Sequence, residues 1–214
     1  MKKIKVNEMY YSIQGESSLS GLPCIFIRLT YCNLRCTYCD SEYAFYDGKD
    51  FSIDEILEKI KEYNCNLVEV TGGEPLLQSQ CINLLRELIN NKYDVMLETS
   101  GSLSIKEVPE DVKKIIDFKC PTSGMEHKNL WAIINDINNN DEVKFVIGNK
   151  QDFEWAVNKI KEYNIEKKCI ILFSSVFGEI EYEQVVGWML DSKIKARFQI
   201  QLHKHIWEES TKGV

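Results

Sequence analysis

The sequence predicts an α/β fold, an incomplete (β/α) barrel of about six mainly parallel strands. From residue 50 onwards, segments with the apolar period of a strand alternate with segments that have the period of a helix, as in consecutive βαβ units. The chain has 214 residues, whereas a complete eight-stranded barrel typically needs about 250. Because no linker, repeat or low-complexity tract interrupts the pattern, we expect residues 1–214 to form a single domain.

The first two predicted strands are residues 4–13 and 23–30. In the second, successive side chains alternate with the period of two that places them on opposite faces of a sheet. A turn-rich loop over residues 14–21 joins them. Ser52 and Glu55 have the spacing of a capping box and predict the start of the first helix. Further strands are predicted at residues 67–71, 93–98, 113–119, 142–147, 169–174 and 194–202. Further helices are predicted at residues 79–91, 126–138, 150–163 and 181–191.

The composition excludes several classes of function. Lys and Arg number 26 and Asp and Glu 33, which gives a net charge of −7. Such an acidic chain is a poor nucleic-acid binder, because that affinity comes mainly from basic side chains on phosphates. No apolar run approaches the roughly 18 residues of a membrane span, and no apolar segment follows the basic N-terminus as in a signal peptide. We therefore expect a cytoplasmic protein with no nucleic-acid or membrane partner.

Three of the eight cysteines, Cys32, Cys36 and Cys39, follow a predicted strand with the spacing C-x3-C-x2-C. In a reducing compartment, thiols grouped in this way indicate a metal site or catalysis. Structural zinc needs four ligands, and one of the other cysteines could supply the fourth. A 4Fe–4S cluster on three cysteines leaves one iron open to bind a ligand. The spacing favours iron–sulfur and leaves zinc as the alternative.

A second motif, Thr71-Gly-Gly-Glu-Pro75, ends a predicted strand. It would lie at the carboxyl ends of the parallel strands, where ligands bind. Its glycines allow backbone to approach a ligand closely, although the motif alone also fits a plain strand-to-helix turn. Together the two motifs resemble the radical S-adenosylmethionine (SAM) superfamily, whose signature has an aromatic residue before the last cysteine, here Tyr38. This resemblance implies a radical SAM core with a 4Fe–4S cluster, whose open iron binds the methionine part of SAM.

A narrower resemblance, to 7-carboxy-7-deazaguanine synthases, covers nearly the whole chain. It rests on the segments Tyr10–Glu16, Gly21–Pro23, Phe26–Leu29, Cys39–Ser41, Glu98–Ser102 and Gln201–Lys204. It implies a carbon–nitrogen lyase of queuosine and deazapurine biosynthesis. The implied reaction is a radical-mediated ring contraction of 6-carboxy-5,6,7,8-tetrahydropterin to 7-carboxy-7-deazaguanine, with loss of ammonia. It also implies Mg²⁺ as a cofactor, a homodimer, and flavodoxin or ferredoxin as the electron donor.

The resemblance also implies roles for individual residues. Those expected to contact the substrate are Ile13, Gln14, Gly15, Glu16, Arg28, Thr71, His203 and the terminal Val214. Those expected to contact SAM are Tyr38, Cys39, Asp40, Gly73, Asp117, Phe118, Lys119, Ser174, Ser175, Val176 and Phe177. Those expected to act in catalysis are the cluster ligands Cys32, Cys36 and Cys39, together with Glu98. Ser41 is expected to bind Mg²⁺ through its hydroxyl oxygen.

Several of these residues also have a plainer interpretation. Arg28 lies between apolar neighbours on a predicted strand, and its planar fork suits the substrate carboxylate, but an ion pair with a strand neighbour is the alternative. Glu16 and Glu98 could accept N–H groups of the heterocycle or be solvated loop charges. His203, in a predicted strand, could be structural, and Ser41 could cap a turn.

Two segments differ from the family pattern. Asp117–Lys119 replaces the Ser-Pro-Lys of many members, and residues 174–177 replace a more usual Gln-Pro sequence.

Two other functions stay open. One alternative function is a glycyl-radical-enzyme activase of the same superfamily, which would act on a partner protein. The other, of a different class, is an iron–sulfur or zinc-binding module.

Overall fold

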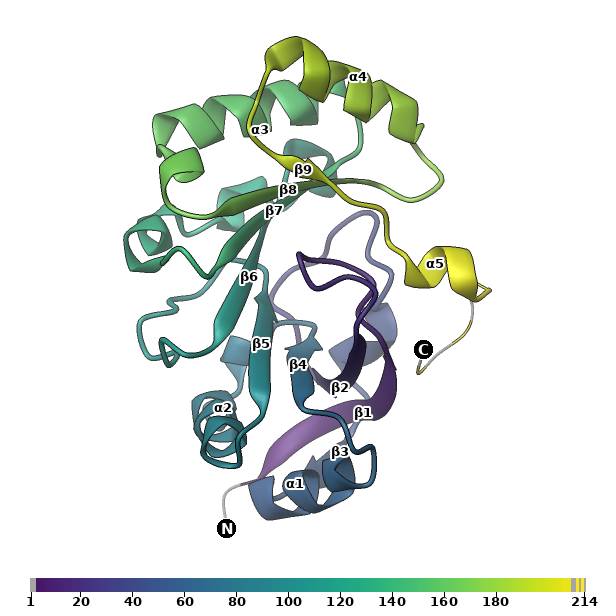
Figure 1. Cartoon of the computed structure of the whole chain (residues 1–214), viewed down its shortest axis with the longest axis vertical. Helices are drawn as coiled ribbons and strands as arrows, with labels where there is room; N and C mark the ends of the chain where they lie inside the picture. Colours follow the sequence, from purple (N-terminus) through teal and green to yellow (C-terminus); the bar gives the residue numbers. More distant parts are fainter. Residues whose placement is uncertain (1–2, 209–210, 212, 214) are drawn as a thin grey trace.

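The structure, a computed structural model, describes residues 3–208, 211 and 213. Its strands form one sheet in the order β3-β1-β2-β4-β5-β6-β7-β8-β9 (Figure 1). The strands are β1 (Ile4–Ile13), β2 (Pro23–Leu29), β3 (Lys49–Phe51), β4 (Leu67–Gly72), β5 (Asp94–Thr99), β6 (Lys113–Phe118), β7 (Glu142–Ile147), β8 (Ile170–Ser175) and β9 (Arg197–Phe198). The helices are α1 (Ile53–Lys61), α2 (Cys81–Asn90), α3 (Lys150–Glu162), α4 (Tyr182–Ser192) and α5 (His203–Ile206).

The sheet is mainly parallel and does not close. β2 and β4 to β9 run parallel to one another, while β1 is antiparallel to both of its neighbours, β2 and β3. β9 has only two residues, and the other six parallel strands have six or seven. Over the described residues, β3 and β9 are the two edges of the sheet. The predicted α/β fold with a mainly parallel sheet is confirmed.

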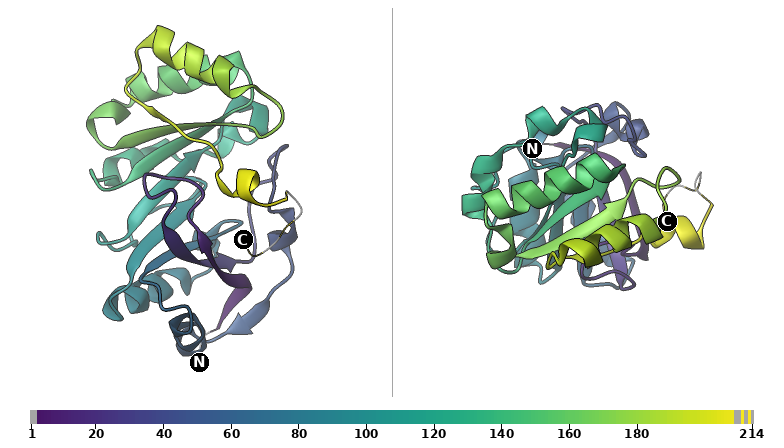
Figure 2. Two further views of the ribbon diagram at one scale, coloured as in Figure 1. Left: turned by 45° about the vertical axis from the view of Figure 1, so that its right-hand side comes forward. Right: turned by 90° about the horizontal axis from the view of Figure 1, so that it is seen from above.

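The two faces of the parallel strands have different chemistry. On β4, Val68 and Val70 pack into the apolar core beneath the helices, whereas Glu69 and Thr71 line a cavity on the other face. β5, β6 and β7 alternate in the same way, because successive side chains of a strand point to opposite faces. In Figures 1 and 2 the helices α1 to α4 lie on the outer side of the sheet and the C-terminal segment lies on the inner side. The fold therefore has an apolar outer core and a polar interior.

Two of the described helices, α1 and α3, begin at a residue whose side chain caps them. Ser52 accepts from the backbone N–H of Glu55, whose side chain accepts from the N–H of Ser52, so the predicted capping box of α1 is confirmed. Asn149 caps α3 in a similar way by accepting from the N–H of Asp152. The longest helix in the described part of the chain, α3, has 13 residues. None of the described helices combines the length and apolar character that crossing a membrane requires.

The prediction of a helix over residues 126–138 is wrong. The segment instead forms two short 3₁₀ helices, Glu126–Lys128 and Trp131–Asp136. Between them, the Asn129 side chain accepts from the N–H of Lys119 and donates to its carbonyl oxygen, both at 2.9 Å. Trp131 in turn stacks on Phe118 with ring centroids 4.5 Å apart. These contacts tie the segment to the end of β6 and override its helical periodicity.

The strand predicted over residues 194–202 is much shorter, Arg197–Phe198. Beyond it the chain leaves the sheet and crosses to the loop after β1, where Leu202 donates its backbone N–H to the carbonyl oxygen of Gly15 at 2.9 Å. His203, predicted to lie in a strand, therefore begins the short helix α5. The apolar periodicity of residues 194–202 did not indicate that their last residues bind the loop after β1 instead of extending the strand.

The glutamate of the Gly-Gly-Glu-Pro motif is structural. Glu74 is fully buried, and its carboxylate accepts from the Thr99 hydroxyl at 2.9 Å and from the backbone N–H of Ser100 at 2.8 Å. It also accepts from the Ser100 hydroxyl at 2.6 Å and from the N–H of Leu76 at 3.0 Å. Because the contacts with Thr99 and Ser100 join the end of β4 to the end of β5, Glu74 fixes the floor of the cavity.

Glu74→Ala should lower the free energy of unfolding by about 3 kcal/mol, because buried donors would lose their acceptor. Urea unfolding of the metal-free protein measures this. Glu107→Ala is the matched control; Glu107 is exposed, and its loss should change stability by less than about 0.5 kcal/mol. A loss below about 1 kcal/mol for Glu74→Ala would contradict the structural role.

Candidate active site

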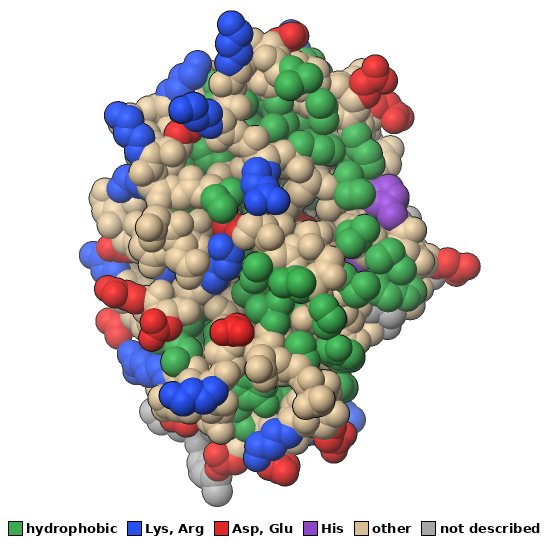
Figure 3. All heavy atoms as spheres, in the orientation of Figure 1, with side chains coloured by type: hydrophobic (Ala, Val, Ile, Leu, Met, Phe, Trp, Pro, Cys, Tyr) green, Lys and Arg blue, Asp and Glu red, His purple; other side chains and the backbone are tan. Residues whose placement is uncertain are grey.

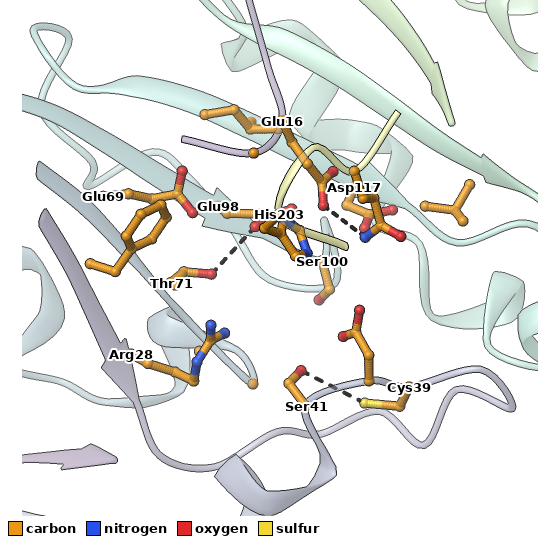
Figure 4. Close-up of a pocket in the computed structure, with 18 of the residues that line it drawn as sticks. Glu16, Arg28, Cys39, Ser41, Glu69, Thr71, Glu98, Ser100, Asp117 and His203 are labelled. Atoms are coloured by element: carbon orange, nitrogen blue, oxygen red, sulfur yellow. Dashed lines mark hydrogen bonds between the residues drawn. The ribbon is translucent and has the colours of Figure 1, made fainter. Parts of the chain in front are cut away.

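A cavity of about 400 Å³ opens at the carboxyl ends of the parallel strands. Parallel sheets bind their ligands at this end. Three further segments complete its walls: the loop after β1, the loop between β2 and β3 that holds the cysteine motif, and the C-terminal segment around α5. Figure 4 shows side chains from all of these segments around one common space, among them Glu16, Cys39 and His203.

The cysteine loop places its three thiols on this cavity. Cys32, Cys36 and Cys39 all line it, and the backbone N–H of Cys39 donates to the carbonyl oxygen of Cys36 at 3.3 Å. Burial raises the pKa of Cys32, and it raises that of Cys36 to about 11. At neutral pH these thiols are therefore protonated and weak nucleophiles, and bound metal is the means by which they would become thiolates. This environment fits metal ligands better than catalytic nucleophiles.

The arrangement of the thiols also bears on the kind of metal centre. Within the described residues, no three Cys, His, Asp or Glu side chains converge closely enough to hold a single metal ion. A four-iron cluster holds its cysteine ligands at separate iron corners, so it does not need thiols that converge on one point. The loop therefore fits a cluster better than mononuclear zinc, which needs four ligands around one ion.

Gly73 holds the cysteine loop against the sheet. A Cβ atom at this position would lie 2.3 Å from the carbonyl oxygen of Tyr31 and 2.6 Å from Cβ of Cys32. Only a glycine permits this approach between the end of β4 and the cysteine loop. The two sequence motifs are therefore in direct contact.

Lys144 is the centre of the charge network in the cavity. Its side chain is 5% exposed, and its Nζ lies 2.8 Å from Glu16, 2.5 Å from Glu98 and 3.3 Å from Asp117. Burial alone would lower the pKa of Lys144, but the three carboxylates outweigh it and raise that pKa well above its usual value. The network therefore keeps a buried cation fully charged.

The network also holds its acidic partners in the ionised form. Burial favours neutral Glu16 and Asp117, but Lys144 outweighs it at Glu16, and Lys119 and Lys144 outweigh it at Asp117. The pKa of each carboxyl group is consequently below its usual value. Lys119 contributes a direct contact of 2.9 Å with Asp117.

Arg28 is engaged with strand neighbours. Its Nε donates to Glu8 at 2.7 Å, and its Nη2 donates to the Tyr10 hydroxyl at 2.9 Å. Glu8 lies directly opposite Arg28 in the β1–β2 register. The ion pair that the sequence left open as an alternative is therefore present, while the guanidinium also lines the cavity.

The C-terminal segment closes one side of the cavity. Lys204 pairs with Asp40 of the cysteine loop at 2.9 Å. His203 packs against Gly15 so closely that a Cβ atom there would lie 2.2 Å from its Nδ1. Burial lowers the pKa of His203, so its neutral form is favoured. The segment thereby joins the loop after β1 to the cysteine loop.

Known proteins match the whole chain. The model of the radical SAM superfamily matches residues 26–187. The chain is 39% identical to the 7-carboxy-7-deazaguanine synthase of Koribacter versatilis, over 99% of this chain and 100% of that protein. It is 42% identical to that of Chlorobaculum tepidum, over 99% and 97%. The chain belongs to the 7-carboxy-7-deazaguanine synthase family of the radical SAM superfamily. The crystal structure of QueE from Escherichia coli has the same fold, with a TM-score of 0.79 and 21% identity over 94% of this chain and 95% of that one.

The structure brings most of the residues expected from the family onto one cavity. Those that line it are Ile13, Gln14, Gly15, Glu16, Arg28, Cys32, Cys36, Tyr38, Cys39, Asp40, Ser41, Thr71, Gly73, Glu98, Asp117, Lys119, Val176, Phe177 and His203. The cavity walls therefore combine residues from the first strand that the structure describes and from the C-terminal segment around α5.

Three expected residues are placed away from the cavity, and a fourth is not described. The Phe118 side chain lies in the apolar core, and Phe118 is not among the residues that line the cavity. Ser174 and Ser175 are buried on β8 and are not among the residues that line the cavity. Val214 lies outside the described residues. The individual roles of all the site residues remain predictions.

The sequence interpretation missed two charged residues of this family member, Lys144 and Glu69. Both side chains line the cavity and lie on mainly apolar strands, Glu142–Ile147 for Lys144 and Leu67–Gly72 for Glu69. Buried parallel strands are usually continuous apolar runs, so a charged residue within such a strand could have indicated a side chain that faces the site. Charged residues are rarely buried unless they are paired.

Gly15→Ala should displace the C-terminal segment, because a real Cβ atom cannot lie 2.2 Å from the His203 ring. Limited trypsin digestion should then cleave after Lys204 about tenfold faster, which corresponds to about 1.4 kcal/mol of lost docking free energy. Gly187→Ala is the control, because open space surrounds Gly187 on α4. Equal cleavage rates in the two variants would contradict the docking role.

Proposed function

We propose that this protein is a 7-carboxy-7-deazaguanine synthase. It converts 6-carboxy-5,6,7,8-tetrahydropterin to 7-carboxy-7-deazaguanine by a radical-mediated ring contraction, with loss of ammonia. The observation that carries the proposal is the identity of about 40% to synthases along their full length. The cavity supports it, because the cysteine loop and the carboxylate network of Lys144 share that one space.

The charges of the cavity suit a pterin that carries a carboxylate. Glu16 and Glu98, both paired with Lys144, are acceptors for N–H groups of the heterocycle. Arg28 uses Nε and Nη2 for its strand neighbours, and we assign its Nη1 donors to the substrate carboxylate. Thr71 and neutral His203 lie between these groups and would complete the substrate site.

The opposite part of the cavity suits the cluster and SAM. Cys32, Cys36 and Cys39 would hold the cluster. The buried Tyr38 hydroxyl and Asp117 Oδ1 have no hydrogen-bond partner among the residues that the structure describes. Buried polar atoms without partners are unusual, so a ligand that reaches them would satisfy them. Bound cluster and SAM would supply the one-electron chemistry and hydrogen-atom transfer, while the protein orients the substrate and excludes water.

The remaining expectations form part of the same proposal. The whole chain acts as one domain in the cytoplasm and accepts electrons from flavodoxin or ferredoxin. A homodimer is consistent with the apolar side chains that gather on the face drawn in Figure 3. Exposed large apolar side chains include Tyr11, Leu22 and Leu190, and surfaces of this kind serve as interfaces between chains.

Anaerobic turnover tests the proposal. With reductant, SAM, Mg²⁺ and the carboxytetrahydropterin, and without any protein substrate, the product chromophore should form. Cys32→Ala, Cys36→Ala and Cys39→Ala should each abolish product and lower the iron content, because each removes a cluster ligand. Cys65→Ala, which lies away from the cavity, should retain both. A protein that cleaves SAM only with a partner polypeptide would instead be an activase, and a colourless zinc protein would be a binding module.

Ser41→Ala should abolish stimulation of turnover by Mg²⁺ with little change in stability. Ser41 lines the cavity, and its hydroxyl does not cap the 3₁₀ helix Glu42–Phe45 that follows it. This oxygen suits Mg²⁺, which prefers hard oxygen ligands. Ser41→Thr keeps the oxygen and should retain the stimulation, as seen in a Mg²⁺ titration. Full stimulation of the alanine variant would exclude Ser41 as a ligand.

A further inference from the structure

Among the carboxyl groups that line the cavity, Glu69 differs from the three around Lys144. Glu16, Glu98 and Asp117 each contact Nζ of Lys144. Glu69, at an inward position of β4, is 5% exposed and forms no ion pair with any described residue. Its one hydrogen bond among these residues comes from Nε2 of Gln14. A buried carboxyl group without a cation loses its hydration and gains no compensating charge, which favours the protonated form.

The surroundings of Glu69 reinforce this preference. Burial, followed by the negative charge of Glu98, raises the pKa of Glu69 to about 8. Glu16 raises it further, whereas the hydrogen bond from Gln14 and the more distant charge of Lys144 lower it. Two other titratable groups face this carboxyl group, Tyr10 from β1 and Cys24 from β2. Burial raises the pKa of both, to about 12 for Tyr10, so both are neutral at pH 7.

The hydrogen bonds of Gln14 locate the proton of Glu69. Gln14 is 3% exposed, and its Oε1 accepts from the backbone N–H of Glu16 at 3.1 Å. Because a backbone N–H can only donate, this contact fixes the orientation of the Gln14 amide. Its Nε2 must then donate to Oε2 of Glu69. Oε2 is the accepting oxygen, so the proton of the neutral acid lies on Oε1.

Glu69 is directed toward the substrate region. Figure 4 shows its carboxyl group on the side of the cavity where Glu98, Thr71 and His203 also lie. Thr71 lies two positions further along the same face of β4. A hydrogen-bond donor at Oε1 is therefore available to a ligand bound among these residues.

We propose that Glu69 binds the substrate as a neutral carboxylic acid, donating its Oε1–H to an unprotonated ring nitrogen or carbonyl oxygen of the heterocycle. This inference rests on the proposed function and deepens it. The ionised Glu16 accepts N–H groups of the ligand, whereas Glu69 requires an acceptor from it. A buried site that is built to pair with a particular polar group discriminates strongly against analogues that lack it. Glu69 is thus a specificity-determining residue for the heterocycle.

Two substitutions at this position and two controls test the proposal in the cluster-loaded enzyme. Glu69→Gln keeps a donor and an acceptor but cannot ionise, and Glu69→Leu removes both. Glu16→Gln removes the charge of a group that the structure holds ionised and replaces one of its accepting oxygens with a donor NH₂. Glu58→Gln changes an exposed glutamate on α1 and controls for charge alone. The dissociation constant of the carboxytetrahydropterin is measured from pH 6.5 to 9.5, together with SAM cleavage in the absence of the pterin.

The neutral fraction of Glu69 falls about tenfold per pH unit above its pKa. Pterin binding by the wild-type protein and by Glu58→Gln should therefore weaken by about tenfold between pH 8.5 and 9.5. Glu69→Gln should bind as wild type at pH 7 and lack this alkaline loss. At pH 7, Glu69→Leu should bind at least about tenfold more weakly than wild type, and this difference should shrink above pH 8.5 as the wild-type donor is lost. Glu16→Gln should bind at least about tenfold more weakly at every pH, because it loses an ionised acceptor for the ligand. SAM cleavage without the pterin should be unchanged in both Glu69 variants.

Three results would overturn the role of Glu69 and leave the proposed function intact. These are weak binding by Glu69→Gln at pH 7, an unchanged alkaline loss in Glu69→Gln, and wild-type binding by Glu69→Leu. The infrared carbonyl band of a protonated carboxylic acid, present in wild type and absent in Glu69→Gln, gives a readout independent of activity. If the wild-type enzyme formed no deazaguanine at all, the proposed function would fail instead.

Discussion

The buried ammonium group of Lys144 is the interaction on which the polar interior depends. It lies on β7 and contacts Glu16 in the loop after β1, Glu98 on β5 and Asp117 on β6. Removing one partner from such a buried network leaves charges without compensation, which typically costs about 3–5 kcal/mol. Lys144 therefore joins four segments of the chain, and it also determines which carboxyl groups remain ionised beside the substrate site.

A cavity of this kind is compatible with a stable fold because the two faces of the sheet are separate. The apolar residues of the parallel strands, such as Val70, Leu97 and Phe145, pack with the helices on the outer side. The inner side needs no apolar packing, so it can carry charges as long as each is paired or neutral. Glu74 shows the same principle at the floor, where a buried carboxylate is satisfied by donors from the neighbouring strand end and by the N–H of Leu76.

The fold could be predicted from the sequence where the pattern is local. Strands β4 to β8 and helices α1 to α4 follow from apolar periodicity and caps, which depend on neighbouring residues in the chain. The two errors lie where distant residues decide the structure. Asn129 is held by the backbone of Lys119, and Leu202 is held by Gly15. Neither contact leaves a periodic signal.

The site was predictable to a similar extent. The spacing of the cysteine motif and of the Gly-Gly-Glu-Pro motif identified two segments that the structure brings into contact at Gly73 and Cys32. Lys144 and Glu69 were missed, because a single charge in an apolar strand does not reveal which partner it meets. Their partners come from other strands and from the loop after β1, so only the order of the strands in the sheet defines them.

That strand order also explains why one carboxyl group can stay neutral among ionised ones. Neighbouring strands lie about 4.8 Å apart. Asp117 lies one strand from Lys144 and Glu98 two strands, within reach of a long lysine side chain, whereas Glu69 lies three strands away on β4. Distance across the sheet thus places Glu69 beyond contact with the cation while Glu98 remains between them. The same sheet therefore supplies both acceptors that contact Lys144 and a neutral donor, because Glu69 is buried and lies beyond contact with Lys144.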